Sequence, residues 1–406
     1  MGEELSRRLG TSDAVVVGLG AMLGAGVFAA FGPAARAAGG WLPVALAAAA
    51  VVAWCNATSS ARLAALYPAS GGTYVYGRER LGPFWGYLAG WTFVIGKTAS
   101  CAAMALTFAA YAAPGHERPA AVAAVLALTA LNWHGVQRSV TATRVIVAVV
   151  VAVLVAVVVV AAGQGRADHL VPSEPFSLLG VLQGAGLLFF AFAGYARIAT
   201  LGEEVHDPAR TIPRAIGIAL GVVLVLYAAT AVAVLSVLGP DRLGAAAAPL
   251  AEAAEAAGAG WLVPVVRVGA AAAALGALLA LILGVSRTGF AMARDRHLPA
   301  VLDAVHPKHR VPHRAELAVG IVVAVLAGTV DLRGAIGFSS FGVLLYYAVA
   351  NASAYTLGRR AVPVAGLIGC LVLAASLPWT SVAAGLAVVA AGVLLYAVRG
   401  RSPAAR

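Results

Sequence analysis

The sequence predicts an all-α polytopic membrane protein, and three observations carry that prediction. Hydrophobic residues make up 61% of the 406 residues and charged residues only 11%, whereas soluble domains average about 45–50% and 25%. The apolar residues gather in runs, and about 20 such residues span a bilayer as a helix. Lys and Arg lie mainly in the short segments between the runs. Soluble and disordered classes are therefore excluded.

Twelve apolar segments are predicted to cross the membrane. The segment 119–135 is short, and the segments 315–330 and 362–377 are shorter still. The other nine are 14–37, 41–61, 84–112, 140–162, 176–200, 212–238, 261–286, 334–357 and 381–398.

The distribution of positive charge predicts the orientation. With the N-terminus in the cytoplasm, 20 of the 28 Lys and Arg residues fall on the cytoplasmic side and six on the outer side, while Lys97 and Arg197 lie within the membrane. The net charge of +11 then faces the anionic inner leaflet rather than nucleic acid. We expect a multi-pass plasma-membrane protein with both termini cytoplasmic and with membrane lipid as a partner.

Glycine interrupts two of the predicted helices. The run 18–28 contains Gly20, Gly24 and Gly26, and the run 189–195 contains Gly194. A broken helix frees N–H groups that suit a carboxylate and carbonyls that suit an ammonium. Interrupted spans at corresponding positions of two halves indicate a midplane binding site in an inverted-repeat transporter. The alternative is close helix packing through the GxxxG pattern of Gly20 and Gly24.

Several motifs, in order from about residue 12 to 315, resemble those of the amino acid–polyamine–organocation (APC) superfamily. They are 20–28 for its first helix, 68–74 for the loop after helix 2, Asn132 with Gly135-Val136 for the helix 4–5 connection, 189–195 with 203–208 and 211–216 for its sixth helix, and 286–299 for the end of helix 8. The resemblance implies the leucine-transporter-type fold, a 5+5 inverted repeat of about 12 transmembrane helices with helices 1 and 6 broken.

On that fold the chain divides into six parts. They are a cytoplasmic N-terminus (1–13), a first five-helix repeat (14–162), an extracellular loop (163–175), a second five-helix repeat (176–357), helices 11 and 12 (358–398) and a cytoplasmic C-terminus (399–406).

The resemblance also implies a substrate site. The N–H groups of residues 24–26 would bind a carboxylate, and the carbonyls of Phe190 and Ala193 would bind an ammonium. Phe190 stands where the family has an aromatic residue that covers the substrate, although aromatic residues also simply pack. The substrate-binding residues carried over by position are Ala21, Gly24, Ala25, Gly26, Phe190, Ala193 and Gly194.

Lys97 is predicted to be a coupling or structural charge, because a charge in the middle of a span marks a functional site by default. Many relatives in the superfamily carry a lysine in helix 5 that replaces a sodium ion. That position falls near Val150, in a stretch without lysine. Either Lys97 takes over that role from helix 3, or the coupling differs from that of those relatives. The structural alternative is that Lys97 caps carbonyls at the break in the segment 14–37.

Charged residues at the inner end of the segment 176–200 predict a cytoplasmic gate. Glu203 and Glu204 would pair with Arg287 at the end of the segment 261–286, or would form an interfacial acidic pair. Arg197 would snorkel towards the cytoplasm or pair with Glu204.

These features favour an amino acid permease that works by alternating access. The first repeat has no acidic residue inside a span to hold a cationic side chain. Residues 262–285 lack Ser and Thr, which argues against the helix 8 sodium site of relatives, so proton symport or exchange is expected. No HExxH or GxSxG motif occurs, so neither an enzyme nor a metal or cofactor is expected. The alternatives are a non-transporting sensor, a polyamine or organic cation exchanger, and a channel.

Overall fold

The computed structural model describes residues 9–68, 71–134, 140–307, 309 and 311–400, with side chains described as far as Val398. Parts of both predicted termini, 1–8 and 401–406, lie outside the described residues. Ala69, Ser70 and Gly135-Val136, which belong to the motifs above, also lie outside them.

The described chain is helical throughout, and its one extended contact is an isolated parallel bridge between Leu9 and Val205. The first half contains α1 (Thr11–Met22), α2 (Ala25–Ala29), α3 (Phe31–Ala38), η1 (Gly39–Trp41), α4 (Leu42–Leu66), α5 (Thr73–Leu81), α6 (Pro83–Ala112), α7 (Glu117–Trp133), α8 (Val140–Gln164) and η2 (Ala167–Leu170). The second half contains α9 (Leu178–Phe192), η3 (Ala193–Tyr195), α10 (Ala196–Ala199), α11 (Pro208–Ala245), α12 (Pro249–Ala256), η4 (Gly260–Leu262), α13 (Val263–Arg294), η5 (Ala300–Leu302), α14 (His313–Thr329), α15 (Leu332–Tyr355), α16 (Ala361–Ser376) and α17 (Trp379–Gly400).

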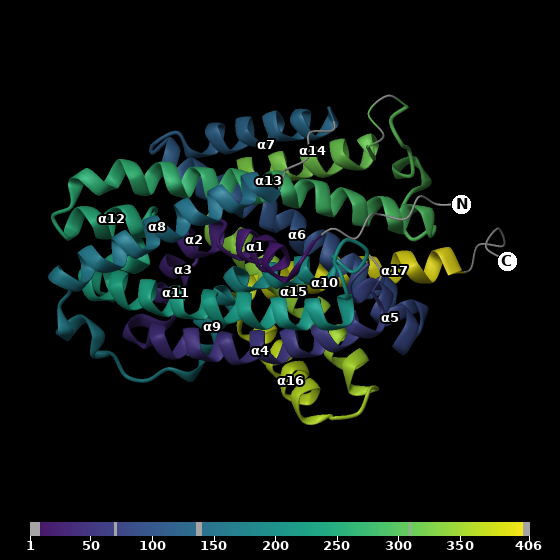
Figure 1. Ribbon diagram of the computed structural model, residues 1–406, viewed down its shortest axis with the longest axis horizontal. Helices are drawn as coiled ribbons and strands as arrows, with labels where there is room; N and C mark the ends of the chain where they lie inside the picture. Colours follow the sequence, from purple (N-terminus) through teal and green to yellow (C-terminus); the bar gives the residue numbers. More distant parts are fainter. Residues whose placement is uncertain (1–8, 69–70, 135–139, 308, 310, 401–406) are drawn as a thin grey trace.

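The helices form an elongated bundle with α1 and α2 near its middle (Figure 1). In this view α11 and α13 run along the long axis on either side of α1. α7 and α14 pack against each other along the upper edge. α5 and the end of α17 lie at the right-hand end, and α12 lies at the left-hand end. The glycine-rich interruption is therefore enclosed by other helices.

Each predicted span overlaps one helix or one group of helices. Nine helical segments of the described residues are long and apolar enough to cross a membrane. The remaining three are α7, α14 and α16, of 17, 17 and 16 residues, which coincide with the three shortest predicted spans.

Several helices extend beyond the predicted span ends. α4 continues to Leu66 and α13 to Arg294, while α11 covers Pro208–Ala245 and bends at Gly239, where φ is +71°. The predicted spans stop where charged residues begin. A helix can nevertheless continue past its apolar part, because its backbone hydrogen bonds also form in water. α5 and α12 are short helices in segments that we had not predicted to be helical.

The outer surface carries large apolar side chains of the kind that lipid covers. α8 has a mean hydropathy of 3.5 in its most apolar stretch, and Val145 and Val159 on it are 59% and 66% exposed. A continuous apolar face of this kind is unfavourable in water but matches a bilayer.

Candidate functional site

The first interrupted helix ends at Met22 and resumes at Ala25. Leu23 and Gly24 lie between α1 and α2, and Gly24 has a ψ of −132°, outside the helical region. A Cβ atom on Gly24 would lie 2.6 Å from the Cβ of Ala277 on α13, so packing excludes a side chain here. The interruption leaves the first N–H groups of α2 without partners inside the helix.

The second interrupted helix is tightened rather than opened. α9 ends at Phe192, and α10 begins at Ala196 after the 3₁₀ turn η3. Phe192, Ala193 and Tyr195 all keep right-handed helical backbone angles. A 3₁₀ turn replaces i→i+4 hydrogen bonds by i→i+3 bonds, so carbonyl groups near Ala193 can be offered to other partners.

The two interruptions touch backbone to backbone. A Cβ on Gly26 would lie 2.6 Å from the Cα of Ala191, and a Cβ on Gly194 would lie 2.5 Å from the carbonyl carbon of Ala21. The structure thus brings Ala21, Gly26 and Gly194 together from the two predicted runs. Backbone atoms therefore fill both positions where a side chain would stand.

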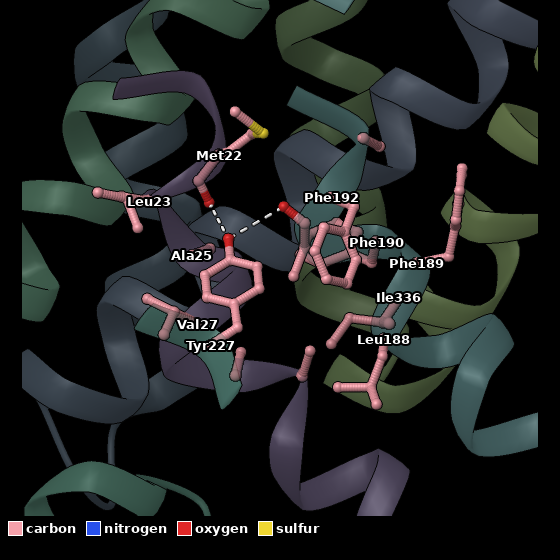
Figure 2. Close-up of a cluster of buried hydrophobic side chains, with 14 of the residues drawn as sticks. Met22, Leu23, Ala25, Val27, Leu188, Phe189, Phe190, Phe192, Tyr227 and Ile336 are labelled. Atoms are coloured by element: carbon pink, nitrogen blue, oxygen red, sulfur yellow. Dashed lines mark hydrogen bonds between the residues drawn. The ribbon is translucent and has the colours of Figure 1, made fainter. Parts of the chain in front are cut away.

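Tyr227 on α11 bridges the two interruptions. Its hydroxyl oxygen lies 2.6 Å from the carbonyl oxygen of Met22 and 3.1 Å from that of Ala191 (Figure 2). The single hydroxyl proton can be donated to one of these carbonyls at a time. A neutral donor therefore satisfies the carbonyl freed at the end of α1.

Lys97 on α6 reaches the second interruption and not the first. Its Nζ donates to the carbonyl of Ala193 at 3.3 Å, and the hydroxyl of Tyr347 on α15 donates to the same carbonyl, also at 3.3 Å. One of the two interpretations of Lys97 was a cap on carbonyls in the segment 14–37, but the carbonyl to which it donates here belongs to the second interruption. The carbonyl expected to receive the substrate ammonium already accepts two hydrogen bonds.

Phe190 lies in α9, one turn before the second interruption. Its side chain is 7% exposed and belongs to the buried cluster that includes Phe189 and Phe192 (Figure 2). Ala25, on the opposite side of the contact between the interruptions, is completely buried. Whether Phe190 covers a bound substrate stays a prediction.

Two of the predicted gate residues, Glu204 and Arg287, lie around Arg197 at the end of the second interrupted helix. Arg197 on α10 interacts electrostatically with both Glu204 and Arg287, and its Nη1 donates to Thr200 at 3.2 Å. The backbone carbonyl of Glu204 also accepts a hydrogen bond of 3.0 Å from the N–H of Leu9. The segment before α1 is thereby attached to the loop that follows α10. Pairing of Glu203 or Glu204 with Arg287 stays a prediction.

Two distant motifs meet at the end of the bundle that carries α5. Tyr74, from the motif at 68–74, donates a short hydrogen bond to Asp295, at the end of α13. The Nη1 of Arg78 lies 3.6 Å from the Asp295 carboxylate, and His297 Nδ1 lies 3.0 Å from the Tyr74 hydroxyl. Burial, together with the Asp295 carboxylate, raises the pKa of Tyr74, so this hydroxyl keeps its proton as a donor.

Sequence reasoning missed Tyr227, Tyr347 and Ala277. A signal for the two tyrosines exists, because a hydroxyl inside an apolar span needs a partner when it is buried. No sequence signal pointed to Ala277, whose role depends on how close α13 comes to Gly24. Within the described ranges, no group of three or more His, Cys, Asp or Glu side chains could hold a metal ion.

Comparison with known proteins agrees with the superfamily resemblance. The profile of the amino acid permease family matches residues 9–402. An uncharacterized transporter of Mycobacterium tuberculosis (strain ATCC 25618 / H37Rv) is 67% identical over 405 residues, covering 98% of this chain and 92% of that protein.

More distant relatives carry substrate names. The branched-chain amino acid permease BcaP of Bacillus subtilis is 26% identical over 438 residues, covering 98% of this chain and 94% of its own. The chloroplastic cationic amino acid transporter 7 of Arabidopsis thaliana is 31% identical over 382 residues, covering 86% and 65%. These relatives are transporters and not enzymes. The chain is a multi-pass membrane protein that belongs to the amino acid permease family within the APC superfamily.

Proposed function

We propose that this permease is a secondary active transporter that moves amino acids across the plasma membrane by alternating access. Residues 14–162 and 176–357 form the two inverted repeats, helices 11 and 12 follow at 358–398, and the termini 1–13 and 399–406 face the cytoplasm. The observation that carries the proposal is the contact between the two interrupted helices, Gly26 against Ala191 and Gly194 against Ala21. Separation of that contact exposes a carboxylate site and an ammonium site together.

The substrate carboxylate binds at the start of α2. The N–H groups of Gly24, Ala25 and Gly26 lack partners inside the helix at this interruption, and the positive end of the helix dipole favours an anion. A Cβ at Gly24 or Gly26 would meet atoms within 2.6 Å, so glycine keeps the backbone approachable. Five residues make α2 short, so the free N–H groups contribute more than the dipole.

The substrate ammonium binds at the second interruption, and Lys97 controls access to it. A carbonyl has two lone pairs, and Lys97 and Tyr347 already donate to that of Ala193. Ammonium binding there requires one of these donors to withdraw. Lys97 is thus the fixed cation of the empty site and takes the role that a helix 5 lysine has in many relatives.

A neutral side chain suits this site better than a cationic one. Lys97 is a buried positive charge, and the first repeat has no acidic residue inside its predicted spans. Phe190 and Ala277 present apolar surface near the two interruptions. Transport is sodium-independent, by proton symport or exchange, and Glu203 and Glu204 close the cytoplasmic side with Arg287.

A counterflow screen in proteoliposomes tests the proposal. Liposomes loaded with each common amino acid should accumulate the labelled form of a neutral amino acid, and lysine or arginine should compete weakly. The amine made by decarboxylating the best substrate should compete at least tenfold more weakly. Equal competition by that amine would show that the carboxylate site is misplaced.

Other outcomes of the same screen identify the alternatives. Binding of an amino acid without counterflow would identify a sensor. Counterflow of a polyamine alone would identify a cation exchanger.

A further inference from the structure

Glu316 is an acidic side chain enclosed by protein without a partner. It lies in the first turn of α14, is 0% exposed, and neither of its carboxylate oxygens has a hydrogen-bond partner among the described residues. Burial of a carboxylate in the charged form is strongly unfavourable without hydrogen bonds or a close counter-ion. Such a group takes up a proton readily.

A second unpartnered acceptor lies at the same level on the neighbouring helix. α7 and α14 run antiparallel, because a Cβ on Gly320 would meet Thr129 and a Cβ on Gly328 would meet Val122. Asn132 lies about one turn after Thr129 on α7, and Glu316 lies about one turn before Gly320 on α14. Because the helices are antiparallel, Asn132 is level with Glu316.

Asn132 uses its donor and leaves its acceptor free. Its Nδ2 donates to the carbonyl of Leu279 on α13 at 3.2 Å, whereas its buried Oδ1 has no partner in the described part of the chain. Two acceptors cannot satisfy each other. A proton on Glu316 would add a donor at this level of the two helices.

The charge around Glu316 comes from Arg287 on α13, the one charged group among the described residues whose field acts on this carboxylate. Three histidines, His306, His309 and His313, lie near one another, and His313 is one turn before Glu316. Burial, together with His306 and Arg314, lowers the pKa of His313, so this ring is neutral at physiological pH.

The elements that pack against α14 carry other ionisable groups among the described residues. They are Tyr87, Lys97, Cys101 and Tyr111 on α6, Glu117 and Arg118 on α7, His134 at its end, Arg267 and Arg294 on α13, and Asp303 after η5.

We infer that Glu316 is the binding site of a coupling proton, a role that rests on the proposed transport function. A metal cation fits less well, because hard cations take about six oxygen ligands and the unpartnered oxygens here number three, from Glu316 and Asn132. Arg287 would also repel a metal ion, whereas a neutral protonated carboxyl tolerates the arginine.

Protonation of Glu316 then acts on the predicted gate through Arg287. Arg287 lies within electrostatic reach of Glu316 and also of Arg197, which interacts with Glu204. With Glu316 deprotonated, the two carboxylates compete for Arg287. With Glu316 protonated, Arg287 is left to Glu204. Binding of the proton at α14 thus biases the end of the second interrupted helix.

Glu316→Gln separates proton coupling from transport. Gln has the shape of the protonated acid and, like it, carries a hydrogen-bond donor. In proteoliposomes at equal pH on both sides, counterflow of the best substrate should stay within twofold of wild type. Accumulation driven by an inward pH gradient should fall at least tenfold. The matched control is Glu255→Gln on α12, whose exposed side chain should leave both assays unchanged.

A measurement without substrate keeps the proton site distinct from the proposed function. The melting temperature of the purified wild type should fall from pH 5 to pH 8 by more than that of Glu316→Gln, because the wild type must either bury a charge or hold a proton at rising pH. This difference should appear even if no amino acid is transported. Absence of counterflow in the wild type would overturn the proposed function alone.

Three results would overturn the proton site. The first is a Glu316→Gln variant that matches wild type in both gradient-driven accumulation and the pH dependence of melting. The second is the loss of wild-type accumulation when choline replaces sodium and potassium, which would identify a metal cation instead. If Glu316→Gln does not fold, Glu316→Asp should keep gradient-driven accumulation with a shifted pH midpoint, and an unchanged midpoint would refute the inference.

Discussion

The two interrupted helices look alike in sequence, but different side chains donate hydrogen bonds to the backbone carbonyls at the two interruptions. Between α1 and α2 the backbone leaves the helical region at Gly24, and a neutral hydroxyl from Tyr227 reaches the freed carbonyl of Met22. Between α9 and α10 the backbone stays right-handed in η3, and a charged Lys97 reaches the carbonyl of Ala193. One interruption is open and neutral, and the other is tight and positively charged.

This difference assigns separate tasks to the two halves. The first interruption leaves backbone N–H groups free, and on the proposed function these bind the substrate carboxylate without a charged side chain. The second offers carbonyls, one of which already accepts from Lys97, and on the proposed function it responds to the arriving ammonium. On the proposed function the substrate therefore contacts both interruptions, whereas the inferred coupling proton binds apart from them, at Glu316 on α14.

The largest expected effect comes from adding a side chain where the two interruptions touch. Gly26→Ala and Gly194→Ala each place a Cβ within about 2.6 Å of backbone atoms, which cannot move without shifting a helix. Both variants should lose more than nine-tenths of the counterflow activity and should express poorly. Gly217→Ala on α11, where a Cβ meets nothing within 4 Å, is the control. Normal activity in Gly26→Ala would refute the backbone contact.

Removal of the charge at the second interruption should have the next largest effect. Lys97→Ala should reduce counterflow at least tenfold, and Lys97→Arg should restore little, because the planar guanidinium is larger and stays charged. If Lys97 only caps Ala193, the alanine variant should melt lower with an unchanged pH profile. If it couples a proton, the pH profile should flatten. Wild-type activity and wild-type melting temperature in Lys97→Ala would rule out both the capping role and the coupling role.

The tyrosines compare the two interruptions directly. Tyr227→Phe leaves the Met22 carbonyl without the Tyr227 donor, which costs about 1–3 kcal/mol for a buried acceptor. Tyr347→Phe should cost less, because Lys97 still donates to Ala193. Chemical or thermal unfolding of the two variants in the same detergent measures the difference. A larger loss of stability in Tyr347→Phe than in Tyr227→Phe would contradict the assignment of Tyr227 as the donor at the first interruption and Lys97 as a donor at the second.

The smallest expected effect concerns sodium. α13 has no Ser or Thr between residues 262 and 285, so hydroxyl ligands for the ion are missing there. Replacement of sodium by choline should leave the initial rate of uptake unchanged within error. A severalfold decrease in choline would show that other oxygens bind the ion.

The amino-acid sequence alone determined the membrane class, the approximate span positions and the location of both interruptions. Apolar runs and glycine clusters are local properties, so they can be identified without knowledge of the packing. The motifs identified the family across most of the chain. Span ends were less well predicted, because a helix such as α13 continues to Arg294 beyond its apolar part.

Only the tertiary structure decided which side chain donates a hydrogen bond to the backbone carbonyls at each interruption. Lys97 lies 96 residues from Ala193 in the chain, and its choice of the second carbonyl depends on the packing of α6 against the rest of the bundle. Glu316 could not be identified from the sequence for the same reason, namely that its environment depends on packing. In the sequence it is an ordinary acidic residue in the first turn of a helix. Its burial and its place level with Asn132 arise only when α14 packs against α7 and α13.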